Sequence, residues 1–454
     1  MKKKVLTVLM TQALVASMLA GCGSSSDNTA DQTQATDSTE QTETTDTAEQ
    51  AATAEAAAEE AAAEETPAID YGSGEITIWV AENVVDLTQQ LVDDFIASND
   101  AYSGYAGNIT VEAVGEGDAA SNMITDVSGG ADIYGFAQDQ LTRLVAAGAL
   151  QPLNDNMTEW VKSSNDEGAV GAATSGDTLY AFPMTSDNGY FLYYDSSVVT
   201  DPTSLEQIIA DCEAAGKGFY ADLDSAWYNA AFFFGAGCTC SFETDADGNF
   251  TSVTADYASD AGLVAIKEMA EVASSSAFVD GSSAGEATNV GAIIDGTWDS
   301  AALEEMLGDN YACAALPSFE GSDGQTYHLS GFSGNKLLGV KPQTEGGKLA
   351  MCYEIAKMLT DTDAQLERFN AQGWGPSNLT AQADSAVQAN VALAALQEQM
   401  PYMIPQGQYP GEWWDLAGAL GADVENGTLT VDSADEDFMK ELSTHDETCA
   451  TLVQ

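Results

Sequence analysis

The chain has 454 residues, of which 72 are acidic and 13 basic, for a formal net charge of −59. No lysine or arginine occurs between Lys4 and Arg143. The chain therefore lacks the cationic surface that binding to nucleic acids or anionic lipid headgroups requires. Its length exceeds that of one ordinary hydrophobic core and predicts two folded lobes.

The N-terminal segment has the order of a targeting signal. Lysines at positions 2–4 precede an apolar stretch over 5–18, and Leu19-Ala20-Gly21-Cys22 follows. The apolar stretch is shorter than the roughly 20 residues that span a bilayer. Residues 1–21 resemble a bacterial lipoprotein signal peptide, in which Cys22 is acylated and becomes the mature N-terminus. The alternative is a buried helix that happens to end in these four residues.

Residues 22–70 are composed almost entirely of small, polar and acidic residues, with no aromatic residue before Tyr71. Such a segment cannot bury enough apolar surface to offset the entropy lost on ordering. We expect a disordered acidic tether, lipidated at Cys22, that holds a folded domain at the outer face of the cell membrane.

The folded part opens with alternating strand and helix patterns. They predict a βαβαβ series and hence a parallel sheet with helices on both faces. The segments are, in order, strand Glu75–Val80, helix Asp86–Ser98, strand Ile109–Val114, helix Ala119–Val127, strand Ala131–Phe136 and helix Asp139–Ala147.

The middle of the chain adds strands Leu179–Pro183 and Tyr190–Tyr194 around a polar bend, helix Ser204–Ala215, and a hairpin over Phe242–Val253. The acidic loop of this hairpin does not predict a calcium site, because Thr254 stands where an EF-hand loop needs glutamate. No dinucleotide fingerprint is present either, so we expect no cofactor.

Six cysteines remain after Cys22. They allow fifteen pairings, and free thiols and one or two disulfides are both open. The two histidines, His328 and His445, stand far in sequence from any cysteine pair. We therefore expect no structural metal site.

Several segments, in order, resemble the extracellular solute-binding proteins of the maltose-binding family. The resemblance spans about 75–440. The segments are Ile76-Thr77-Ile78-Trp79, Gly130–Asp139, Gly148–Leu153, Leu179–Pro183, Asp295-Gly296-Thr297-Trp298, Leu316–Phe319, Gly373–Ser377 and Met403–Gln406.

The resemblance implies an α/β, two-lobed periplasmic-binding-protein-like fold of type II. Each lobe would hold a mainly parallel sheet flanked by helices, with a hinge and a ligand cleft between the lobes. The chain would cross between lobes near Thr185, Ser330 and Ser377. Lobe 1 would comprise 71–185 and 332–377, and lobe 2 would comprise 186–331 and 378–454.

The resemblance also implies which side chains contact a sugar. Aromatic faces stack on a pyranose ring, and carboxylates bind its hydroxyls. The implied residues are Phe136, Asp139, Asp187, Trp227, Tyr228, Trp298 and Trp413. Other roles stay open: core packing for Phe136 and the tryptophans, a helix N-cap for Asp139, and a solvated loop position for Asp187.

Three positions depart from the family pattern. Residues 81–84 offer no lysine, Gln140 stands where an arginine can follow the aspartate, and Ser225 replaces an acid. These departures put maltose itself in doubt and favour a longer α-glucan that depends more on stacking.

The resemblance thus implies the binding component of an ABC importer for oligosaccharides, above all maltodextrins. It would be a monomer without enzymatic activity whose partners are two permease subunits. Alternatives are another oligosaccharide, a cationic solute bound through cation–π contacts, or a sensory role. A surface glycosidase would need a carboxylate pair about 5 Å apart, and no catalytic motif supports it.

Overall fold

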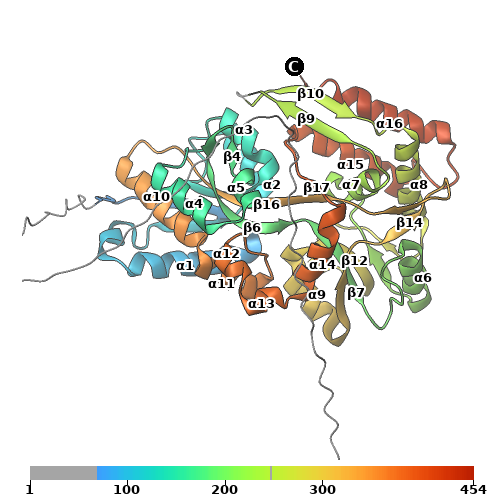
Figure 1. Ribbon diagram of the computed structural model, residues 1–454, viewed down its shortest axis with the longest axis horizontal. Helices are drawn as coiled ribbons and strands as arrows, with labels where there is room; N and C mark the ends of the chain where they lie inside the picture. Colours follow the sequence, from blue (N-terminus) through green and yellow to red (C-terminus); the bar gives the residue numbers. More distant parts are fainter. Residues whose placement is uncertain (1–68, 246–247, 454) are drawn as a thin grey trace, which may run out of the picture. The chain divides into compact units, whose positions relative to one another are not determined.

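The computed structural model describes residues 69–245 and 248–453, which belong to one compact unit (Figure 1). The signal peptide, Cys22 and all but the end of the predicted tether lie outside these residues. Within the described part of the chain, none of the helices has the length and apolarity needed to cross a bilayer.

The first lobe is built on a six-stranded sheet of order β17-β16-β3-β1-β2, in which β6 also pairs with β16. Strand β1 pairs in parallel with β2 and β3, as the βαβαβ prediction requires. Strand β16 runs antiparallel to both β3 and β6. The strands are β1 Ile76–Val80, β2 Ile109–Ala113, β3 Ile133–Ala137, β6 Ala181–Asn188, β16 Phe332–Val340 and β17 Ile404–Pro405.

Helices cover this sheet with their apolar faces. Helix α1 buries Thr88, Val92 and Ile96, the helical spacing that the sequence shows. A hydrophobic core joins the N-terminal strands to β16 and to the helix after it. The helices are α1 Val85–Ala97, α2 Glu116–Thr125, α3 Leu141–Ala146, α4 Asp155–Ser164, α5 Glu167–Ala172, α10 Gly346–Leu359 and α11 Thr362–Gln372.

The second lobe is built on a five-stranded sheet of order β11-β8-β12-β7-β13. Strand β8 is parallel to β11 and β12, whereas β7 is antiparallel to β12 and β13. Both lobes therefore have mixed rather than mainly parallel sheets. The strands are β7 Tyr190–Asp195, β8 Gly218–Tyr220, β11 Phe278–Val279, β12 Val290–Gly296 and β13 Tyr311–Ala314.

The second sheet is buried on both faces. Along β7, Tyr190 and Leu192 enter one hydrophobic cluster, and Phe191 and Tyr193 enter another. This alternation explains why the strand reads as a continuous apolar run. The helices of this half are α6 Leu205–Ala215, α7 Ala226–Gly235, α8 Asp260–Ser274, α9 Ser300–Leu307, α14 Val391–Gln399, α15 Gly411–Glu425 and α16 Asp435–Cys449; the short helices α12 Leu379–Gln382, which packs on α11, and α13 Ser385–Gln388 lead from α11 to α14.

Three short hairpins complete the strands of the described residues. The predicted hairpin is confirmed, with its strands at β9 and β10. The pairs are β4 Thr174–Ser175 with β5 Thr178–Leu179, β9 Cys240–Thr244 with β10 Phe250–Ala255, and β14 Ser318–Glu320 with β15 Thr326–His328.

The segments that connect the lobes lie side by side. Strand β6 pairs with β16, and the Ser186 amide donates a hydrogen bond of 3.1 Å to the Gly375 carbonyl. Figure 1 shows β6 and β16 running between the two groups of helices. The chain is thus a two-lobed α/β protein. The exact lobe boundaries stay a prediction.

Candidate functional site

A cavity of about 980 Å³ is lined by residues from both lobes. The first lobe contributes the turns after β1, β2 and β3, at the edge of the sheet where the carboxyl ends of these parallel strands meet. The second lobe contributes the start of α7, the end of β12 and the start of α15. Lys336 of β16 and Trp374 also line the cavity.

Aromatic side chains form one wall of this cavity. Trp227 and Tyr228 come from α7, and Trp414 comes from α15. The ring centroids of Trp227 and Trp414 lie 6.4 Å apart, and Trp227 stacks on Phe332 at 5.2 Å. Trp298 and Trp374 also line the cavity. These rings offer flat apolar faces of the kind that a sugar ring stacks on.

Asp295 places a buried carboxyl group beside the aromatic wall. The Tyr228 hydroxyl donates to Asp295 Oδ1 at 2.6 Å, while Oδ2 is buried and has no partner among the described residues. Burial raises the pKa of Asp295 well above its ordinary value, and repulsion from Asp299 adds to this. A carboxyl group accepts hydrogen bonds from ligand hydroxyls, and its protonated form can also donate one.

Asp139 and Gln140 lie in a short 3-10 turn before α3, and their side chains are linked. The Gln140 amide donates to the Asp139 carboxylate, and Arg143 Nη1 donates to Gln140 Oε1 at 2.6 Å. Burial raises the pKa of Asp139 to about 7, although the Gln140 hydrogen bond and Arg143 oppose this shift. The N-cap alternative for Asp139 is wrong, because α3 begins after Gln140 without any side-chain cap.

Lys336 supplies a positive charge that the sequence analysis missed. Its Nζ lies 4.2 Å from the ring centroid of Trp374, 5.2 Å from that of Trp298, and 3.6 Å from Glu116 Oε1. The side chain is buried yet lines the cavity. Its signal in the sequence was a single lysine inside an otherwise uncharged strand. Residues 81–84 and Gln140, where the family pattern can place a lysine or an arginine, carry no positive charge. Lys336 and Arg143 instead provide the cations in the cavity.

The cavity is otherwise acidic. Against Lys336 and Arg143 stand carboxylates from both lobes. These are Glu82, Glu116, Asp118, Asp139, Asp222, Asp295, Asp299, Glu412 and Asp415.

The structure brings together four of the predicted ligand residues, namely Asp139, Trp227, Tyr228 and Trp298. It places Phe136 and Trp413 elsewhere. Both are fully buried and do not line the cavity, so the expected ligand contact is corrected to core packing. Phe136 packs on Tyr134, and Trp413 packs on Tyr409 with centroids 4.4 Å apart.

Asp187 lies next to the segments that carry Trp298 and Trp374 but does not line this cavity. It is buried rather than solvated, and it accepts hydrogen bonds from the Thr297 hydroxyl and the Gly375 amide. It lines a second cavity of about 1050 Å³. Its hydrogen bonds tie the end of β12 to the segment before α12, which is a structural role.

Comparisons with known proteins agree with this architecture. Residues 90–395 match the family model described as bacterial extracellular solute-binding protein. No curated protein sequence matches the chain significantly. A solved structure described as being with acarbose is 26% identical, with a TM-score of 0.72 over 83% of this chain and 100% of its own.

Two further structures show the same fold at lower identity. The maltodextrin-binding protein MalE1 from L. casei BL23, without ligand, is 22% identical with a TM-score of 0.65, over 83% of this chain and 99% of that one. A cyclo/maltodextrin-binding protein complexed with maltotetraose is 20% identical with a TM-score of 0.59, over 84% and 99%. The family match covers most of the chain, which therefore belongs to the bacterial extracellular solute-binding proteins.

Proposed function

We propose that this protein binds oligosaccharides outside the cytoplasm and delivers them to an ABC importer, with maltodextrins as its main ligands. The observation that carries this proposal is the combination, in one cavity, of several aromatic side chains with carboxyl and amide side chains. The similar solved structures named for maltodextrin and maltotetraose support the same class of ligand.

The polar atoms suit a hydroxyl-rich ligand. The cavity is lined by the carboxyl groups of Asp295 and Asp299 and by the side-chain amide of Asn83. Carboxyl and amide groups of this kind accept and donate hydrogen bonds to ligand hydroxyls. A volume of about 980 Å³ lies near the top of the range for small-molecule sites. It suits an oligosaccharide better than a single sugar ring.

The proposed role needs no chemical step. A solute-binding protein of this family would close its lobes on the ligand and present it to two permease subunits. The ligand shifts this equilibrium only by its different affinities for the open and closed states. The proposal includes an acyl anchor at Cys22, a monomeric state, and the acidic tether as the link between anchor and lobes.

Tryptophan fluorescence provides the test, because Trp227, Trp298, Trp374 and Trp414 line the cavity. Titration with maltotriose should change the emission and saturate. A flat titration with maltotriose and with longer maltodextrins would contradict the maltodextrin assignment. Deleting the gene should lower uptake of labelled maltotriose by the cell, and unchanged uptake would contradict the importer role.

The excess of carboxylates in the cavity favours a cationic solute as a second candidate. Salt separates the two, because ionic screening weakens binding of a cation and leaves that of a neutral sugar nearly unchanged. We expect the maltotriose affinity to stay within about twofold between 20 and 500 mM NaCl. Spermidine binding that is tight at low salt and lost at high salt would favour the second candidate.

A further inference from the structure

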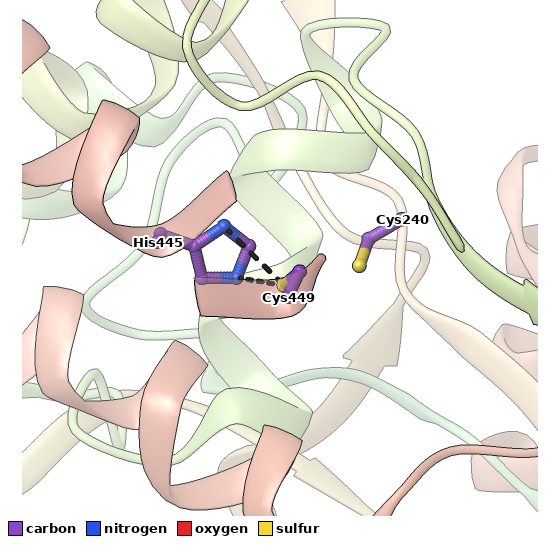
Figure 2. Close-up of side chains that lie close together, drawn as sticks. All are labelled: Cys240, His445 and Cys449. Carbon is purple, nitrogen blue, oxygen red and sulfur yellow. Dashed lines mark hydrogen bonds between the residues drawn. The ribbon is translucent and has the colours of Figure 1, made fainter. Parts of the chain in front are cut away.

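Three side chains that commonly bind metals meet in the second lobe, away from the cavity described above. Cys240 begins β9, whereas His445 and Cys449 belong to α16. The two helical residues are four positions apart and therefore share one helix face. Figure 2 shows these two beside each other, with the Cys240 sulfur across from Cys449. One potential ligand atom from each residue lies within 4.8 Å of the others, and His445 Nε2 is 3.6 Å from Cys449 Sγ.

All three side chains are buried, with 3% of Cys240, 1% of His445 and none of Cys449 exposed. Asp446 contacts His445, so the group has the cysteine, histidine and aspartate that a catalytic triad with a cysteine nucleophile would need. Burial argues against a nucleophilic role, because no substrate can reach a cysteine that is fully covered by protein.

The histidine is held in the orientation of a metal ligand. Its Nδ1 lies 3.0 Å from Asp446 Oδ1, which leaves Nε2 as the ring nitrogen available to a metal; Cys449 Sγ lies 3.6 Å from Nε2 and 4.0 Å from Nδ1. Asp446 is itself fixed by the backbone amides of Tyr257 and Ala258, at 3.3 and 2.8 Å. A carboxylate on the second ring nitrogen is the usual support of a metal-binding histidine. The Tyr257 ring also stacks on the imidazole, with centroids 4.5 Å apart.

Cys240 is held from the other side. The Tyr409 hydroxyl donates to the Cys240 carbonyl at 2.8 Å, and Cys240 pairs with Ala255 in the β9–β10 hairpin. Each ligand thus stands on a helix or strand whose own contacts fix its position. Such support keeps a binding site preorganised.

We propose that Cys240, His445 and Cys449 form a site for a thiolate-seeking d10 metal cation, Zn²⁺ or Cu⁺. Bond lengths of about 2.3 Å to sulfur and 2.0 Å to nitrogen place neighbouring ligand atoms roughly 3.5 Å apart. The observed Nε2–Sγ distance of 3.6 Å agrees. Two thiolates and a neutral imidazole balance the charge of Zn²⁺, whereas the same three ligands leave one net negative charge with Cu⁺.

The bound cation would connect the C-terminal helix α16 to the β9–β10 hairpin. The sequence argument against a metal site relied on the distance of each histidine from a cysteine pair. It overlooked that His445 and Cys449 share one helix face, and it could not show that the fold brings Cys240 to them.

A disulfide between Cys240 and Cys449 is the competing outcome. Its formation joins the two sulfurs and releases two protons and two electrons to an oxidant, such as a thiol oxidase of the cell envelope. It would remove both sulfur ligands and leave His445 without a role. All six described cysteines are free thiols in this structure.

The test uses the full-length protein, purified with a phosphine reductant and loaded separately with Zn²⁺ and Cu⁺. After dialysis, elemental analysis should find about one cation per chain in at least one arm, and the arm that retains it identifies the metal. Cys240→Ser and Cys449→Ser should lose it. Cys352→Ser is the matched control, because Cys352 is equally buried in the first lobe's core and lies outside the cluster.

Co²⁺ gives a second readout if the serine variants do not fold. The wild-type complex should show a thiolate-to-cobalt absorption band. His445→Gln should shift this band or lower the affinity for cobalt at least tenfold. Three results would overturn the proposal: no bound cation and no cobalt band in the reduced protein, equal retention by folded serine variants, or a cobalt spectrum that His445→Gln leaves unchanged.

Discussion

At the scale of single residues, two adjacent tryptophans on α15 have different environments. Trp413 is fully buried against Tyr409, whereas Trp414 is half-buried and lines the cavity. Successive helical residues point about 100° apart, so only one of a pair can face a given surface. The sequence predicted an aromatic contact from this helix, but the choice between the two depends on how the helix docks.

Substitutions at these two positions should therefore affect different properties, ligand binding for Trp414 and stability for Trp413. Trp414→Ala should weaken maltotriose binding by about 1–3 kcal/mol, because it removes a stacking face, and should lower the free energy of unfolding less than Trp413→Ala does, because Trp414 is only half-buried. Trp413→Ala should lower the free energy of unfolding by about 3–5 kcal/mol, because it leaves a core cavity. Calorimetry and urea unfolding measure the two effects. Equal effects of both variants on binding, at equal stability, would contradict the placement.

Asp139 should make stability depend on pH. Its pKa is raised to about 7 in the folded protein, mainly by burial, against about 3.9 in an unfolded chain. Between these values the folded state binds more protons than the unfolded state. Stability contributed by this group is therefore full below about pH 4 and declines as the pH rises to about 7.

The free energy of unfolding of Asp139→Asn should fall by roughly 2–4 kcal/mol less than that of the wild type between pH 4.5 and 8, because asparagine does not titrate. The measurement is the free energy of urea unfolding for both proteins across this range. Asp155→Asn is a suitable control, because Asp155 is exposed in the first turn of α4. Parallel pH profiles of wild type and Asp139→Asn would show that Asp139 titrates normally.

At the scale of elements, the cavity wall depends on the close contact between α15 and the loop that precedes α7. A Cβ atom on Gly421 would lie 1.6 Å from the Leu223 carbonyl oxygen, and one on Gly418 would lie 2.5 Å from that of Asp224. These glycines let α15 approach the loop and so set the spacing of Trp227 and Trp414. In the sequence they appear only as weak points within a helix.

Gly421→Ala should push α15 away from this loop. We expect a loss of about 1–3 kcal/mol or more in unfolding free energy, as for other overpacked sites, together with weaker maltotriose binding. Gly171→Ala in α5 is the matched control, because a Cβ there has open space. It should be neutral or stabilise by up to about 1 kcal/mol. A fully stable Gly421→Ala variant with normal affinity would show that the contact is unimportant.

At the scale of the whole molecule, local patterns predicted the elements better than their long-range partners. The alternating strands and helices over 75–147 and the 242–253 hairpin were predicted from periodicity and are confirmed. The mixed character of the sheets was not predicted. The antiparallel pairing of β16 with β3 and β6 arises from how the chain returns between the lobes.

The candidate site shows the same limit. Trp227, Tyr228, Trp298 and Asp139 were placed from motif positions, and all line the cavity. Lys336 was missed because its contacts, Glu116 and two tryptophans, come from segments far apart in the sequence. The cluster of Cys240, His445 and Cys449 was missed because only the fold joins its two segments.

The predicted anchor concerns the chain as a whole, although Cys22 lies outside the described residues. Cys22→Ala should release the protein from the membrane fraction into the soluble fraction, because no cationic surface is available to hold it. Fractionation followed by a high-salt wash and immunoblotting measures this. A variant that remains in the washed membranes would contradict the lipoprotein prediction.

The central claim is that the cavity between the lobes binds an α-glucan. Isothermal titration calorimetry of the protein against maltotriose, cellotriose, xylotriose and spermidine tests it most directly. We predict heat and saturation with maltotriose and none with spermidine. Heat with cellotriose or xylotriose alone would keep an oligosaccharide binder and replace its ligand, whereas binding of spermidine alone, or of none of the four, would contradict the claim.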